Sequence, residues 1–201
     1  LVSVVNPVSL GVLATPGSYN ADIAVAEAQG LGNPLNAGGP YLGVFACKKE
    51  HMRHMPGRIV GLTKDHDGRR GFVLTLQARE QHIRRERAAS NICSNEALCA
   101  LSATIYLALL GPEGLKEAAE LCVEKAHTLA ELLGKVPGFK VKYAGPYFNE
   151  FVLECPVAAE KVRNGLLKKG ILAGVPLGRF NKDLKNCLLV CATEKRTAGE
   201  M

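Results

Sequence analysis

The stretch that decides the fold is Ser94-Asn-Glu-Ala-Leu-Cys-Ala-Leu-Ser-Ala-Thr-Ile-Tyr-Leu-Ala-Leu-Leu-Gly-Pro112. Ser94 or Asn95 can cap a helix, and Glu96 places a negative charge in its first turn. The helix should run to about Leu110 and be buried between layers, because it is apolar on almost every side. Gly111-Pro112 ends it and sets Pro112 at the first position of a second helix.

After Pro112, apolar residues at helical spacing continue one helix to Leu133, and Gly134 and Pro137 stop it. Period-two alternation then predicts two strands, Phe139–Tyr143 and Phe151–Cys155. A short helix at Val157–Lys169 and strands at Ile171–Gly174 and Cys187–Ala192 complete the order α, β, β, α, β, β. This order is typical of a small α/β layer.

Residues 1–89, before this stretch, carry most of the glycine and favour strands and loops. Arg58–Thr63 and Phe72–Leu76 flank a turn in which Asp67-Gly68 can supply positive φ angles, so a β-hairpin is expected. The change in composition therefore falls near Ser90.

Composition excludes several classes of protein. The 201 residues have 47% hydrophobic content and a net charge of +6, so they can build a core, and the charge suits acidic partners. The seven cysteines have no paired spacing and are expected to be free thiols in the cytoplasm. The apolar run Ala97–Leu110 is shorter than the roughly 20 residues that a membrane span needs. Since the chain opens on Leu1 rather than Met, we expect it to be a piece of a longer protein.

The candidate sites are weak when read from residue types alone. His51 and His54 lack a matching acidic or thiol ligand, so no metal site is expected. Gly30–Pro34 and Gly38–Gly43 match no nucleotide motif; they either admit an anion or form tight turns against another subunit. Gln77–Arg87 is a dense run of mixed charge, usually a solvated helix face. Ser90–Asn95, which follows it, is a capped helix start that also suits a phosphate.

Four segments together resemble the glycine dehydrogenase (decarboxylating) family, the P-protein of the glycine cleavage system, and its first subunit where the protein is split in two. They are Met55–Gly61, Asp67–Arg87, Ser90–Asn95 and Ile105–Leu115. The resemblance implies an α/β chain with the type I pyridoxal-phosphate-dependent transferase fold. Residues 1–111 would be the C-terminal part of its large domain, and residues 112–201 most of its small C-terminal domain.

The resemblance also implies that this chain lacks the cofactor lysine. In the cofactor-carrying subunit, a strand is followed by His-Lys-Thr and then by a glycine-rich loop. Aligned on Ala21–Ala28 and Gly38-Gly39-Pro40, that pair falls on Gln29 and Gly30. Glycine has no amine to hold the aldehyde, so no catalytic residue is expected here. Lys48 and Lys49 are interpreted as surface charge.

The implied complex therefore holds pyridoxal phosphate in a second, lysine-bearing subunit, in a cytoplasmic heterotetramer. The reaction would be decarboxylation of glycine with aminomethyl transfer to the lipoyl H-protein. Ser90 and Asn91 would contact the phosphate of the partner's cofactor. The facing loop would be lined by Asn36, Gly38, Gly39 and Tyr41. Basic residues that would attract the acidic carrier, or simply be solvated, are Arg53, Arg58, Arg69, Arg70 and Arg84.

Two other classes of function are weighed against this one. The chain could be a structural or assembly module that keeps the fold without contributing to catalysis. A basic nucleic-acid-binding domain is disfavoured, because tryptophan is absent and no RNA- or DNA-binding motif appears. As a piece of a larger protein, the chain is also expected to expose normally covered surface and to self-associate.

Overall fold

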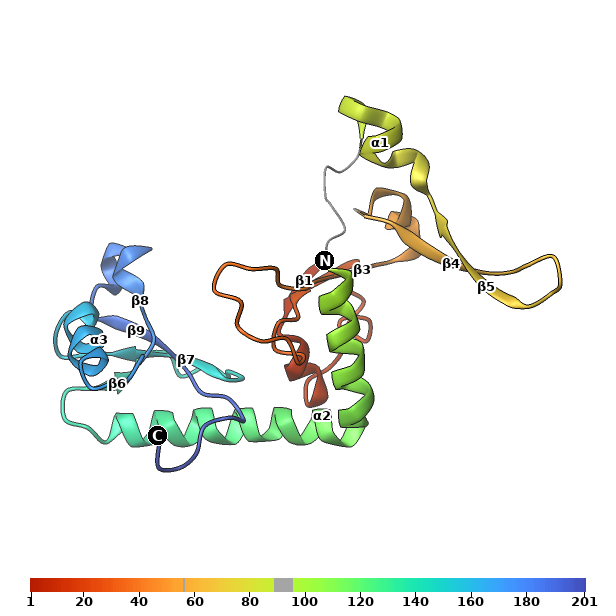
Figure 1. Cartoon of the computed structure of the whole chain (residues 1–201). Helices are drawn as coiled ribbons and strands as arrows, with labels where there is room; N and C mark the ends of the chain where they lie inside the picture. Colours follow the sequence, from red (N-terminus) through yellow and green to blue (C-terminus); the bar gives the residue numbers. More distant parts are fainter. Residues whose placement is uncertain (56, 89–95) are drawn as a thin grey trace. The chain divides into compact units, whose positions relative to one another are not determined.

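The computed structural model describes residues 1–55, 57–88 and 96–201 (Figure 1). These form two compact units, which are described separately. The first unit comprises Leu1–Pro7 and Leu13–Gly111, and the second comprises Val8–Val12 and Pro112–Met201. The main boundary between the units thus lies between Gly111 and Pro112. The short segment Val8–Val12 is the one part of the chain before Gly111 that is assigned to the second unit.

The first unit contains a three-stranded sheet of β1 (Val2–Val5), β2 (Ile23–Glu27) and β3 (Gly43–Cys47). Strand β1 runs parallel to β2, and β3 pairs antiparallel to β2 in the register Ile23↔Cys47. Alternating β-branched and small residues suit such a sheet. The loop from Ala28 to Leu42 joins β2 to β3 and contains the predicted site position Gly30.

The predicted hairpin is confirmed as β4 (Ile59–Lys64) and β5 (Arg70–Thr75), paired antiparallel. Of the two turn residues proposed from sequence, only Gly68 has a positive φ, at 77°. The turn is closed instead by Asp65, whose Oδ1 accepts hydrogen bonds from the backbone N–H groups of Asp67 and Arg69, each at 2.9 Å. A side chain therefore supplies the turn geometry that Asp67 was expected to provide.

Short helical turns precede and follow the hairpin. A 3₁₀ helix, η2 (Lys49–His54), comes after β3. The mixed-charge run after β5 forms η3 (Gln77–Arg79), α1 (Gln81–Arg84) and η4 (Arg85–Arg87). It is not one regular helix, because Leu76 at its start and Arg85 within it have φ values of 56° and 52°.

Helix α2 (Ala97–Gly134) contains both predicted helices, and its path is interrupted at Gly111, where φ is 66° and ψ is −179°. Only glycine adopts this backbone conformation readily. The predicted end of α2 at Gly134 is also confirmed. The 14 residues before Gly111 extend about 21 Å, short of the roughly 30 Å hydrocarbon core of a bilayer.

Among the described residues, α2 as a whole is the one helix whose length and apolar composition would be sufficient to cross a membrane. Neither half on its own combines the length and the composition of a span. The part before Gly111 is too short, and the part after Pro112 carries charged residues including Lys116, Glu117 and Glu120.

The expected burial of the first half of α2 is wrong for this chain. Ala103 is its one buried residue in the part that the structure describes. Leu98 and Leu109 are 77% and 84% exposed, and Leu101 and Ile105 are also exposed. These four side chains lie on one helical stripe. Loop 28–42 packs against the neighbouring face of the helix. The apolar side chains of the helix are therefore covered on that face only.

The second unit is built on a four-stranded sheet in the order β6-β7-β9-β8. The strands are β6 (Lys140–Val141), β7 (Glu150–Glu154), β8 (Val175–Pro176) and β9 (Cys187–Cys191), with α3 (Ala159–Leu167) between β7 and β8 (Figure 1). The predicted order α, β, β, α, β, β is confirmed, with the fifth element at Val175–Pro176 rather than at its predicted position. Short 3₁₀ turns lie outside the strands: η1 (Pro7–Gly11), η5 (Leu177–Arg179) and η6 (Lys182–Leu184).

The strand predicted at Ile171–Gly174 is wrong. Those residues are irregular, and pairing with β9 begins at Val175. The reason is Gly174, whose φ is 137° and whose absent β-carbon would lie 2.1 Å from the carbonyl oxygen of Leu189. The chain approaches β9 too closely there for a regular ladder.

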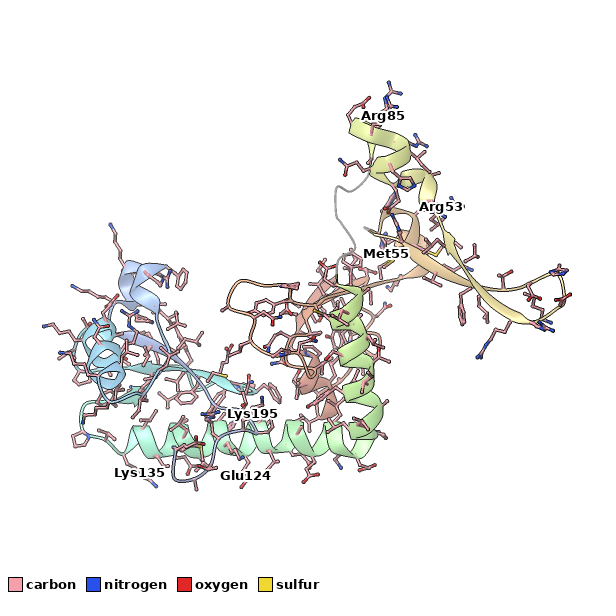
Figure 2. The ribbon with its side chains drawn as sticks, viewed as in Figure 1. Arg53, Met55, Arg85, Glu124, Lys135 and Lys195 are labelled. Carbon is pink, nitrogen blue, oxygen red and sulfur yellow. The ribbon has the colours of Figure 1, made fainter. Side chains whose placement is uncertain are left out.

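The core of the second unit joins both helices to the sheet. Ala130 of α2 and Ala159 of α3 are buried in one cluster with Phe151, Leu153 and Leu188. Near the C-terminus, the segment after β9 crosses α2, where Figure 2 labels Lys195 and Glu124. There the Cys122 thiol donates to Glu194 Oε2 at 3.3 Å and accepts from the Glu194 backbone N–H, also at 3.3 Å.

Candidate functional site

The loop at the carboxyl end of β2 begins with a carboxylate that holds its two ends together. Glu27 Oε1 accepts from the backbone N–H of Gln29 at 2.8 Å and from that of Leu42 at 3.1 Å. The Ala28 N–H donates to the Leu42 carbonyl at 2.7 Å. Sequence reasoning missed Glu27; an acidic residue at a strand end, followed by a glycine-rich loop, is the signal that was available.

The middle of the loop is fixed to the first half of α2. The Asn33 side chain, which is buried, donates to the Cys99 carbonyl at 3.3 Å, and Ser102 Oγ donates to the Gly32 carbonyl at 3.0 Å. Gly32 has φ of 80° and lies directly against Tyr106. Backbone, amide and hydroxyl groups therefore hold the middle of the loop in place.

The four loop residues predicted to line the site lie together in one turn. The Gly39 N–H donates to the Asn36 carbonyl at 2.9 Å, and Asn36 Nδ2 donates to the Pro40 carbonyl at 2.7 Å. Gly38 has φ of 103°, and Tyr41 is exposed. The Asn36 amide N–H thus closes the turn, while the Tyr41 ring is open to solvent.

Loop 28–42 offers no group that could hold an aldehyde. It contains no charged residue, and Gln29 at the expected histidine position donates from Nε2 to the Asn33 carbonyl at 2.6 Å. Gly30 is exposed and its φ is not positive. The loop can position a neighbouring molecule by contact and hydrogen bonding, but apart from the Tyr41 hydroxyl it supplies no acid, base or nucleophile.

The nearest lysine after the loop in sequence, Lys48, lies at the other end of β2. Its Nζ is 2.6 Å from Asp22 Oδ1, at the start of the strand. Five strand residues separate Asp22 from the loop, a rise of about 16 Å. Lys48 is therefore an ion-pair partner of Asp22 and cannot replace an amine at Gly30.

Asp22 also contacts the N-terminal amine of Leu1. Lys48 is the main reason, and this amine the next, that the pKa of Asp22 falls from 3.8 to about 2. Ser90 and Asn91, predicted to contact a cofactor phosphate, lie outside the described residues.

Most of the basic residues considered for carrier binding have local interactions. Arg58 pairs with Glu80 at 3.7 Å, and Arg69 pairs with Asp67 at 4.0 Å. Arg70 lies over the Phe72 ring. Arg84 Nε donates to the Ala78 carbonyl at 3.0 Å. Figure 2 shows Arg53 beside the start of the hairpin. These contacts agree with the interpretation of a solvated, locally paired surface.

One cluster that the sequence did not predict joins Asp22 to Glu50 and His51, whose ligand-type atoms lie within 4.8 Å of one another. Sequence reasoning missed it because Asp22 is 28 residues from Glu50 in the chain. Within the cluster, Asp22 pairs with Lys48, and His51 Nε2 lies 3.5 Å from Glu50 Oε1.

Six cysteines are described and all are free thiols, as expected. Cys122, Cys155 and Cys187 are buried in the second unit and Cys191 is exposed. Burial raises the pKa of Cys122 to about 11 and also raises that of Cys155. A raised pKa suppresses the thiolate, so these thiols act as packing groups.

The architecture belongs to the type I fold of pyridoxal-phosphate-dependent enzymes. An X-ray structure of a NifS-like protein from Rickettsia africae matches with a TM-score of 0.60 at 12% identity, over 99% of this chain and 49% of that chain. The crystal structure of an inhibitor-bound glycine decarboxylase (P-protein) of the glycine cleavage system matches more closely. Its TM-score is 0.91 at 49% identity, over 99% of this chain and 45% of that chain.

The chain belongs to the glycine cleavage system P-protein family, whose family model matches residues 1–201. It is 58% identical to the probable glycine dehydrogenase (decarboxylating) subunit 1 of Moorella thermoacetica, and equally to that of Desulfitobacterium hafniense. Each alignment covers 100% of this chain and 45% of the relative. The chain thus spans a little under half the length of these relatives.

Proposed function

We propose that this chain is part of subunit 1 of a two-subunit glycine dehydrogenase (decarboxylating), and that the partner subunit holds pyridoxal phosphate. The family match and the names of the closely similar relatives support membership of such a complex. The assignment of the cofactor to the partner subunit rests on the composition of the loop after β2. It has glycine at position 30 and no charged side chain from Ala28 to Leu42.

The residues of this chain do not fit a covalently held aldehyde cofactor. The candidate position has no amine, and Lys48 is paired with Asp22 at the far end of β2. Pyridoxal phosphate, when bound to an enzyme, acts as an electron sink for carbanion chemistry. That chemistry is assigned to the partner, and this chain contributes a positioned surface.

In this proposal, Ser90 and Asn91 donate to the phosphate of the partner's cofactor. The turn formed by Asn36, Gly38, Gly39 and Tyr41 faces the same site. Glu27 and Asn33 are positioning residues, because their hydrogen bonds fix the loop that carries this turn. Glycine is the substrate, the lipoyl H-protein accepts the aminomethyl group, and the complex works in the cytoplasm.

The test uses the full-length subunit and its partner, each purified alone and then mixed. Glycine-dependent bicarbonate exchange should appear only in the mixture. Borohydride reduction should trap a pyridoxyl group on a lysine of the partner and on none of this subunit. A yellow subunit 1 with a trapped pyridoxyl adduct of its own would contradict the proposal.

The alternative, an assembly module without a catalytic contribution, is separated by Ser90→Ala and Asn91→Ala in the reconstituted enzyme. Loss of a phosphate contact should weaken cofactor affinity and lower turnover, whereas an assembly module would leave both unchanged. Sedimentation of the mixed subunits provides the control, because it shows whether each variant still assembles.

A further inference from the structure

The second unit carries an uncompensated positive surface. Between Ala159 and Lys185 there are seven cationic residues and only two acidic ones, Glu160 and Asp183. The segment therefore carries +5 of the chain's net charge of +6. The cations are Lys161, Arg163, Lys168, Lys169, Arg179, Lys182 and Lys185.

None of these seven cations has a carboxylate within 4.0 Å in the part of the chain that the structure describes. The two arginines are oriented by uncharged partners instead. Arg163 donates from Nε and Nη2 to Asn164 Oδ1 at 3.2 and 2.9 Å. The Arg179 guanidinium lies 5.0 Å from the centre of the Phe180 ring. These contacts orient both guanidinium groups and leave their positive charges free to pair with a carboxylate of another molecule.

Two of these seven cations line an open pocket of about 350 Å³. Arg163 of α3 and Arg179 of η5 contribute to its lining, and Leu172, Val175 and Leu189 give it an apolar wall. Glu150 is the one acidic residue among those that line it. Its volume is sufficient for one or two side chains.

Large exposed apolar side chains lie in the pocket wall, at Leu172 and Val175, or next to lining residues in the sequence, at Ile171 and Phe180. Leu172 is 78% exposed and Phe180 is 72% exposed, and Ile171 and Val175 are exposed as well. Apolar anchors beside a pocket, with charge at the rim, are the arrangement found at protein interfaces. We call the pocket together with the seven cations the basic groove.

We propose that the basic groove docks an acidic partner protein, which inserts an apolar side chain into the pocket and places carboxylates against Arg163, Arg179 and the neighbouring lysines. Charge complementarity selects this occupant. A second copy of the chain would bring like charges together, since the same segment would meet itself. An anionic membrane would engage protruding groups and leave the concave pocket unfilled. This inference does not depend on the proposed function.

The test measures binding of fluorescein-labelled peptides to the full-length subunit by fluorescence anisotropy. The probe is the acidic peptide EDELDEE, with one central leucine, and the matched control is EDESDEE. The leucine peptide should bind more tightly, because only it has an apolar anchor. Both affinities should fall as salt is raised from about 50 to about 200 mM, since the remaining contacts are ionic.

Matched variants locate the contact. Arg179→Glu should weaken binding of the leucine peptide about tenfold at low salt, whereas Arg69→Glu, on the hairpin of the first unit, should change it less than about twofold. Leu172→Ser should remove the preference for leucine over serine. Arg179 and Leu172 are exposed, so the variants should keep the fold; circular dichroism checks this, and Arg179→Gln repeats the test without charge reversal.

Four results would overturn the proposal. The first is equal affinity for the two peptides, or no binding of either. The second is an equal loss in Arg69→Glu and Arg179→Glu, which indicates diffuse attraction. The third is slow maleimide labelling of a Leu172→Cys variant of the full-length subunit. Slow labelling would show that another part of the same subunit covers the groove. The fourth is displacement of the peptide by phosphatidylserine vesicles that bind the subunit through the same residues.

Discussion

Gly32 and Tyr106 are in such close contact that no side chain fits at position 32. A β-carbon built on Gly32 would lie 2.6 Å from the β-carbon and 2.7 Å from Cγ of Tyr106. The contact joins the loop after β2 to the first half of α2, alongside the hydrogen bonds of Asn33 and Ser102. The predicted site loop is therefore fixed by packing against its own chain at this glycine.

Gly32→Ala should destabilise the full-length subunit by about 2–3 kcal/mol, because it combines a left-handed φ of 80° with a steric clash. Urea unfolding measures the loss. Gly30→Ala, two residues away, is the matched control: its φ is not positive and it is exposed, so its effect should be small. Equal losses in the two variants would contradict the geometry.

Gly111→Ala should cost about 1–3 kcal/mol, because φ of 66° with ψ of −179° is accessible almost only to glycine. The β-carbon itself meets nothing within 4 Å, so the cost comes from the backbone alone. Gly134→Ala at the end of α2 has neither a positive φ nor a steric neighbour and serves as control. Thermal unfolding should show a lower midpoint for the first variant only.

Asp22→Asn should remove a stabilising contribution that depends on pH. Lys48 is the main cause of the lowered pKa of Asp22, about 2 instead of 3.8. A carboxyl group whose pKa is lower in the folded state stabilises that state above pH 3.8, and the contribution disappears as pH falls toward 2. Urea unfolding of the 201-residue chain should separate wild type from variant at neutral pH. A difference that persists at the folded pKa would refute the ion-pair explanation.

Cys122 should resist alkylation in the folded protein. Burial raises its pKa from 9.0 to about 11, which lowers the thiolate fraction about a hundredfold near pH 8. Its side chain is also only 2% exposed. Iodoacetamide treatment followed by peptide mass spectrometry measures the rate, and the same protein in urea supplies the reference. Rapid labelling without denaturant would show that the contact with Glu194 opens readily.

The isolated 201-residue chain should self-associate through the first half of α2. Leu98, Leu101, Ile105 and Leu109 form an exposed apolar stripe, and such surface favours burial against another molecule. Sedimentation velocity should show association that the Leu98→Gln/Leu109→Gln double variant reduces. Glu117→Gln, on the charged part of the same helix, should leave it unchanged. A monomer over the micromolar range would contradict this prediction.

Local patterns were sufficient to predict most elements of the second unit. The helical spacing up to Leu133, the stop at Gly134, the alternation in β7 and the apolar run of β9 all depend on neighbouring residues, and each is confirmed. The strand at Ile171–Gly174 failed because Gly174 approaches Leu189, a residue 15 positions away. No pattern within the segment reports such an approach.

The sequence by itself determined the family, most helices and strands of the second unit and the absence of an amine at position 30, because these follow from residue identity and short-range spacing. Only the tertiary structure decided which side chains meet. It showed Lys48 paired with Asp22, Asn33 bonded to the helix, and Arg163 and Arg179 lining one pocket. Such contacts depend on how distant segments pack, and residue order along the chain does not specify the distances between them.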